Sequence, residues 1–199
     1  FDCFILAILS HGRENGVLGT DEEVIAIEHI TSYFDRCPTL LRKPKLFFLQ
    51  ACRGEMQDVG HDFTDSAGVP PSDATAREDS VAPMSNDELA RRMFELELGD
   101  DVDASYAIKS KLPSQSDMLL AYATLPGFVS WRNTERGSWF VQALCEVFLN
   151  HSHNEDLLSM MTMVNDKVAR AFESSSGRKK QMPAPVMTLR KKLFFKPGL

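Results

Sequence analysis

The stretch Leu46-Phe47-Phe48-Leu49-Gln50-Ala51-Cys52-Arg53-Gly54 decides the fold class of this sequence. Its apolar run, Leu46–Leu49, lies between the helix-breaking Pro44 and the glycine at position 54, which predicts a short buried strand. Polar residues follow the run, so Cys52 is expected at the carboxyl end of the strand, where parallel sheets carry their binding sites. A cysteine in that position is a candidate nucleophile.

A second apolar run, Phe1–Leu9, ends two residues before His11. Between the two runs, Ile27–Phe34 has apolar residues at helical spacing, which gives the order strand, helix, strand. Such a unit makes the two strands parallel, with their carboxyl ends at the same edge of the sheet. A lone histidine after a strand is more often structural, but Cys52 at the end of the neighbouring strand favours a catalytic His11.

Composition limits the classes of partner and compartment. The chain has 199 residues, 43% apolar and 25% charged, which is typical of one globular domain. Its net charge of −6 argues against nucleic acid or an anionic membrane as a partner. The four cysteines, Cys3, Cys37, Cys52 and Cys145, have neither disulfide nor metal-ligand spacing, so we expect reduced thiols, a cytoplasmic protein and no metal or other cofactor. The chain begins inside an apolar run, so we expect it to be part of a longer protein.

The middle of the chain has the composition of a linker. Residues 55–82 contain few large apolar side chains and many Asp, Ser, Gly and Pro. Ser85–Glu88 matches a capping box, which predicts a short amphipathic helix that either rests on the surface or acts as a docking or self-inhibiting element. Further predicted elements are a strand at Met118–Tyr122, helices after Gly137 and over Asp156–Phe172, and one or two final strands at Val186–Leu189 and Leu193–Phe195.

The sequence resembles the caspases, cysteine proteases that cut after aspartate. Gln50–Gly54 matches their local signature, and His11 lies 41 positions before Cys52. Four later segments resemble the caspase small subunit, in the same order: Ser130–Asn133, Arg136–Phe140, Phe172–Ser174 and Lys179–Pro183. The resemblance covers Phe1 to about Phe195, apart from the linker, and is nearest to the executioner type and to the nematode cell-death caspase.

The resemblance implies an α/β fold and a division of the chain. The expected fold is a caspase-like three-layer sandwich, with a mostly parallel central sheet of about six strands and helices on both faces. Residues 1–65 correspond to the large subunit without its amino-terminal part, 66–103 to a removable intersubunit linker with a short helix, and 104–199 to the small subunit. Together they form one caspase domain.

The same resemblance assigns roles to individual residues. Cys52 is the nucleophile, and His11 is the base and then the acid for the leaving amine. The N–H groups of Gly12 and Cys52 would hold the oxyanion, and Gly12 permits close approach because it has no side chain.

The substrate aspartate is expected to bind Arg132 and Gln50, since a guanidinium fork backed by an amide suits a small carboxylate. Ser130 and Arg132 would also offer main-chain groups to a bound peptide. Trp131, Asn133 and Trp139 complete the expected substrate site.

Three features depart from the caspase pattern. A second pocket arginine, expected from a segment well before His11, is not in this sequence. The loop Ser174–Arg178 is short, and Val129 replaces an aromatic residue, which leaves the two tryptophans as the main apolar walls. Pro185 falls in the strand expected to pair across a two-fold dimer axis, where it cannot donate a hydrogen bond.

The linker contains two tetrads with the form of cleavage sites. Asp62–Asp65 precedes Ser66, and Asp100–Asp103 precedes Ala104. We expect the enzyme to cut itself after Asp65 and Asp103 and to prefer Asp-x-x-Asp peptides, although two acidic tetrads in an acidic linker could also be coincidence.

The expected function is therefore that of an aspartate-directed cysteine endopeptidase of programmed cell death. It would act on protein substrates as a homodimer of processed large and small subunit pairs, with an activating scaffold or an inhibitor protein as a further partner. The alternative is a non-catalytic caspase-like module that regulates an active caspase by dimerisation. An arginine- or lysine-directed protease is a weaker alternative, because its pocket would need acidic residues where this chain has Arg132.

Overall fold

A parallel-rich sheet forms the centre of the computed structural model, which describes residues 2–14, 16–62, 112–133, 135–174 and 178–195. The strand order is β1-β5-β6-β9; β1, β5 and β6 are parallel, and β9 is antiparallel to β6. The strands are β1 (Phe4–Leu9), β5 (Lys45–Gln50), β6 (Met118–Tyr122) and β9 (Ala184–Met187). The described residues thus supply four strands of a sheet for which about six were expected.

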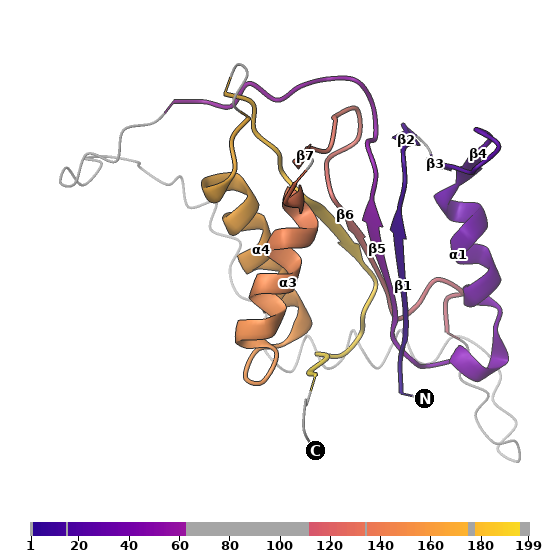
Figure 1. The fold of residues 1–199 in the computed structure, drawn as a ribbon. Helices are drawn as coiled ribbons and strands as arrows, with labels where there is room; N and C mark the ends of the chain where they lie inside the picture. The colour runs from indigo at the N-terminus through magenta and orange to yellow at the C-terminus, as the bar shows by residue number, and fades with distance from the viewer. Residues whose placement is uncertain (1, 15, 63–111, 134, 175–177, 196–199) are drawn as a thin grey trace, which may run out of the picture. The chain divides into compact units, whose positions relative to one another are not determined.

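Helices cover both faces of this sheet, as Figure 1 shows. On one side lies α1 (Ile27–Asp35), followed by the short η1 (Pro38–Leu40). On the other side lie α3 (Trp139–His151) and α4 (Leu157–Ala171). The predicted three-layer α/β class is therefore confirmed.

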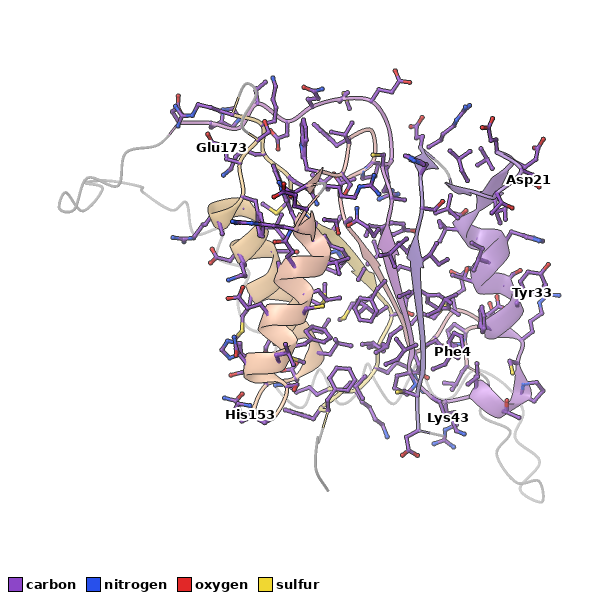
Figure 2. All side chains as sticks on the ribbon, in the orientation of Figure 1. Phe4, Asp21, Tyr33, Lys43, His153 and Glu173 are labelled. Atoms are coloured by element: carbon purple, nitrogen blue, oxygen red, sulfur yellow. The ribbon has the colours of Figure 1, made fainter. Side chains whose placement is uncertain are left out.

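Strand β5 explains why the sheet needs two cover layers. All of its residues except Gln50 are buried, and successive side chains enter opposite cores. Leu46 and Phe48 pack with the α3 and α4 side chains, whereas Phe47 and Leu49 pack toward α1. On the α1 side, Phe4 stacks on Phe34 with ring centroids 4.4 Å apart; Figure 2 labels Phe4 between β1 and α1.

Short strands lie next to the carboxyl edge of the sheet. A three-stranded antiparallel sheet has the order β2-β3-β4, and a two-stranded one pairs β7 with β8. The strands are β2 (Gly12–Arg13), β3 (Gly16–Leu18), β4 (Val24–Ala26), β7 (Arg132–Asn133) and β8 (Gly137–Ser138).

The two long helices begin at side-chain caps. The Ser138 hydroxyl accepts a hydrogen bond from the Val141 N–H, and the Asp156 carboxylate accepts from the N–H groups of Leu158 and Ser159. The Asp156 pKa is lowered, chiefly by the hydrogen bond from the Ser159 hydroxyl, so this cap is charged near neutral pH.

The last strand differs from the prediction. It spans Ala184–Met187, so it begins before the predicted Val186, and it includes Pro185 as the resemblance implied. Phe194 makes only an isolated bridge to Asp156. Pro185 lies opposite Ala121 in the ladder. Three residues later, the Thr188 N–H points toward β6 and donates to the Met118 carbonyl. Because bonded and non-bonded pairs alternate in an antiparallel ladder, the Pro185 nitrogen faces the outer edge of β9, where proline is tolerated.

The described helices and strands all belong to one compact unit. The predicted linker helix, the boundaries at 65/66 and 103/104, and both processing aspartates lie outside the described residues and stay predictions. Within the described part, no helix is long and apolar enough to cross a membrane. The same residues contain no group of three or more His, Cys, Asp or Glu that could hold a metal ion.

Candidate active site

The register of β1 and β5 brings His11 and Cys52 together at one edge of the sheet. Leu9 pairs with Gln50, and the Ser10 N–H donates to the Gln50 carbonyl at 3.1 Å. His11 and Cys52 each follow two residues after that last pair, so the two chains leave the sheet side by side. The parallel βαβ unit predicted from the sequence produces this placement.

Gly12 lies directly against the backbone of residues 51–54, the segment that follows β5 and is called here the cysteine loop. A Cβ atom built on Gly12 would lie 2.3 Å from the Cys52 carbonyl oxygen and 2.8 Å from the Ala51 Cβ. No side chain fits into that space, because real Cβ contacts are longer. The absence of a side chain at Gly12 therefore allows the segment that follows His11 to approach the cysteine loop closely.

The Cys52 thiol contacts the main chain of Ser130. The Ser130 N–H donates to Sγ at 3.3 Å, and the thiol donates to the Ser130 carbonyl at 3.7 Å. The His11 side chain is exposed, and no hydrogen bond joins it to Cys52 in the part of the chain that the structure describes. Catalytic hydrogen bonds commonly tighten only when substrate binds. The position of His11 and Cys52 at the same edge of the sheet is therefore the feature that identifies them as a candidate catalytic pair.

A loop that follows β6 is held beside the cysteine loop by main-chain bonds. The Arg53 N–H donates to the Phe128 carbonyl at 2.9 Å, and the Gly127 N–H donates to the Arg53 carbonyl at 2.7 Å. Met56 forms a parallel bridge with Phe128. These contacts place residues 128–133 next to Cys52.

Gln50 and Arg132 lie in these two adjoining segments. The Gln50 side-chain amide donates to the Ser130 hydroxyl at 2.7 Å, and its Oε1 atom is buried without a hydrogen-bond partner among the described residues. Arg132 and Asn133 form β7 and are exposed. No described carboxylate pairs with Arg132, so its guanidinium is available to an acidic ligand.

The two predicted tryptophan walls belong to an aromatic stack. The Trp131 ring lies 5.8 Å from the Trp139 ring, which lies 5.6 Å from the Phe172 ring, and both pairs have interplanar angles of 21°. Trp139 is only 7% exposed, while Trp131 is half-buried. Of these two residues, Trp131 offers more ring surface to a ligand.

Two contacts near the site had no predicted role. The Arg53 guanidinium lies 3.9 Å from the centroid of the Tyr122 ring, and burial raises the Tyr122 pKa although Arg53 opposes the shift. Gln181, which is 2% exposed, accepts a hydrogen bond from the Trp131 N–H at 2.7 Å and donates to the Ala123 carbonyl at 2.8 Å. Gln181 stands in a segment that carries the family resemblance, but the sequence does not indicate its partners.

Comparisons with known proteins identify the family. The family model described as "Caspase domain" matches residues 1–194. Cell death protein 3 of Caenorhabditis remanei is 42% identical over 201 residues, covering 98% of this chain and 38% of that protein. Caspase-7 of Gallus gallus is 41% identical over 200 residues, covering 97% of this chain and 55% of the relative.

A solved structure gives the same result. The crystal structure of caspase-1 from Spodoptera frugiperda matches with a TM-score of 0.68 and 32% identity, covering 97% of this chain and 62% of that one. The chain thus spans less than two thirds of the length of these relatives. On its sequence, its fold and the placement of His11 beside Cys52, the chain belongs to the caspase family.

Proposed function

We propose that this protein is a cysteine endopeptidase that cleaves peptide bonds after aspartate and acts in programmed cell death. The observation that carries the proposal is the in-register pairing of β1 and β5, which delivers His11 and Cys52 to the same edge with Gly12 against the cysteine backbone. Membership of the caspase family supports the same chemistry.

The reaction follows from these groups. His11 takes the thiol proton, and the Cys52 sulfur attacks the carbonyl carbon of the scissile bond. The resulting oxyanion receives hydrogen bonds from the Gly12 and Cys52 N–H groups, and loss of one such donor typically costs about 2.7–4 kcal/mol. His11 then protonates the leaving amine as the C–N bond breaks. Water, deprotonated by His11, hydrolyses the thioester and restores the thiol.

Selectivity for aspartate is assigned to Arg132 and Gln50. Arg132 would pair with the substrate carboxylate through a charge-assisted hydrogen bond, and the Gln50 amide would exchange its bond to Ser130 for one to the substrate. The unpaired Gln50 Oε1 is where the additional arginine expected for this family would donate. An unpaired buried acceptor is costly, so a donor at this position would stabilise the pocket.

Hydrolysis of matched tetrapeptides tests the specificity. An Asp-x-x-Asp peptide should be cut faster than the same peptide ending in asparagine, and faster than tetrapeptides that begin with Ile, Leu or Trp. Arg132→Ala should lose most of this preference with little effect on iodoacetamide alkylation of Cys52. Equal rates for the aspartate and asparagine peptides would contradict the assignment.

Activation is proposed to follow self-cleavage after Asp65 and Asp103, with the processed pairs forming a homodimer in the cytoplasm. Both sites have Asp at the cut and at the fourth position counted back from it, and small residues, Ser66 and Ala104, after the cut. Mass spectrometry of an active preparation should find both cuts, and both should be missing in Cys52→Ala. An active preparation with an intact linker would contradict self-processing.

The second candidate is a non-catalytic module that regulates an active caspase by pairing with it. The observation that favours it is the absence of a His11–Cys52 hydrogen bond within the described residues, together with Pro185 at the outer edge of β9. This candidate predicts no peptide hydrolysis by the full-length protein and a changed rate of a partner caspase on mixing. The exposed Arg132 argues against the third, arginine- or lysine-directed alternative.

A further inference from the structure

Gln181 is a buried polar residue that bridges two main-chain groups from distant parts of the chain. Its Oε1 accepts from the Trp131 N–H at 2.7 Å, and its Nε2 donates to the Ala123 carbonyl at 2.8 Å. Ala123 follows β6 directly, is fully buried, and donates its own N–H to the Leu49 carbonyl of β5. One end of the bridge is therefore fixed in the central sheet.

The other end of the bridge is the loop of residues 128–133, which lies next to Cys52 and is called here the peptide-binding loop. Trp131 stands between Ser130, whose main chain contacts the Cys52 thiol, and Arg132, whose side chain is exposed. The Trp131 carbonyl accepts from the Trp139 N–H at 3.2 Å, so the two main-chain groups of Trp131 are both bound. Among the described residues, the Gln181 side chain joins this loop to Ala123 at the end of β6.

The segment around Gln181 is itself held in place. The Lys180 N–H donates to the Asp58 carbonyl at 2.9 Å, and the Lys180 ammonium donates to the Phe172 carbonyl at 2.9 Å. The residue before Gln181 is therefore held by two hydrogen bonds, which limits how far the Gln181 side chain can move.

We propose that Gln181 is a positioning residue for the peptide-binding loop: it fixes the Trp131 main chain to the sheet and thereby sets Ser130 against Cys52 and Arg132 toward the substrate. This inference rests on the proposed function, because the loop binds peptide only if the protein is a peptidase. Gln181 touches neither the thiol nor the guanidinium, so its effect is on binding geometry and not on the chemical groups themselves.

The test is Gln181→Met in the full-length processed protein, because methionine conserves side-chain volume while removing both hydrogen bonds. Leaving the Trp131 N–H and the Ala123 carbonyl unpaired should raise KM for an Asp-x-x-Asp peptide by about 10- to 100-fold, with a much smaller change in kcat. The rate of Cys52 alkylation by iodoacetamide, which needs no bound peptide, should change much less than KM.

Thr188→Val is the matched control. Thr188 also accepts from one main-chain N–H, that of Met118, and donates to one carbonyl, that of Gln115, but it does so at the other end of β6. It should lower the melting temperature without changing KM. An unchanged KM in Gln181→Met, or an equal rise in KM in Thr188→Val, would overturn the positioning role.

Hydrogen exchange of the wild-type protein tests the inference without a variant or a substrate. The Trp131 amide should exchange slowly, at least about 100-fold slower than an unstructured amide, because its N–H is bound to a buried acceptor. Rapid exchange at Trp131 would overturn the inference even if Gln181→Met did not fold. A wild-type protein that binds and cuts no peptide, but protects Trp131, would defeat the proposed function and leave the loop tether intact.

Discussion

Gly12→Ala places one methyl group at the closest contact between the histidine and cysteine loops. The added Cβ would lie 2.3 Å from the Cys52 carbonyl oxygen, 2.8 Å from the Ala51 Cβ and 3.1 Å from the Gly16 carbonyl oxygen. Two of the three neighbours are backbone atoms, which cannot rotate away. Because the crowding comes from the cysteine loop and from β3, the alanine cannot be accommodated by moving in one direction.

The size of the effect follows from these distances. Non-bonded heavy atoms at optimal separation are about 3.5 Å apart or more, so the loops that carry His11 and Cys52 must separate by roughly 1 Å. A displacement of about 1 Å in a catalytic arrangement can cost on the order of 100-fold in rate. We therefore expect kcat/KM for an aspartate peptide to fall about 100-fold, equivalent to about 2.7 kcal/mol.

The assay is steady-state hydrolysis of an Asp-x-x-Asp peptide by Gly12→Ala, with Gly19→Ala as the control. A Cβ on Gly19 would approach within 3.5 Å only the side chain of Asp21, which can move, so this variant should keep activity within about twofold of wild type. Circular dichroism should show that both variants are folded. A folded Gly12→Ala enzyme with wild-type kcat/KM would refute the claim that the Gly12 contact sets the site.

Four further predictions concern stability and assembly. Two hydrogen bonds from Arg190 hold the pKa of Asp117 below its usual range. Ionised Asp117 should therefore stabilise the fold above about pH 4, and this contribution should be lost as the pH falls through the lowered pKa. In Asp117→Asn, the free energy of unfolding in urea should depend less on pH in this acid range. Met160→Ala empties a fully buried core position and should cost about 2–5 kcal/mol in urea unfolding. Leu149→Ala, at a position 82% exposed, should cost under about 0.5 kcal/mol. Pro185→Val adds an outward N–H to β9 and should tighten self-association several-fold in sedimentation velocity, and an unchanged dissociation constant would show that β9 lies outside the interface.

Local patterns were enough to predict the central elements. The apolar runs that became β1 and β5, and the helical spacing that became α1, already required parallel strands with His11 and Cys52 at one edge. The strand at Met118–Tyr122 was predicted with its observed bounds. These elements depend on short-range periodicity, which the sequence displays directly.

Features that depend on long-range pairing were harder to predict. The apolar run Val186–Leu189 predicted the start of β9 two residues too late, although the family resemblance already placed Pro185 in this strand. An edge strand accepts such a proline when its nitrogen faces outward. The burial of Trp139 comes from its stack with Phe172, 33 positions away, and Gln181 binds partners 50 and 58 positions away. No local pattern indicates such contacts.

The central claim is that Cys52 is a nucleophile, activated by His11, in a site that binds aspartate. Its most direct test is peptide-mapping mass spectrometry of the full-length processed protein after treatment with an aspartyl ketone inhibitor. We predict one label per chain on Cys52, no label in Cys52→Ala, and labelling slowed by at least about 100-fold in His11→Ala. Absence of label on Cys52, or equal labelling by a lysyl ketone, would contradict the account.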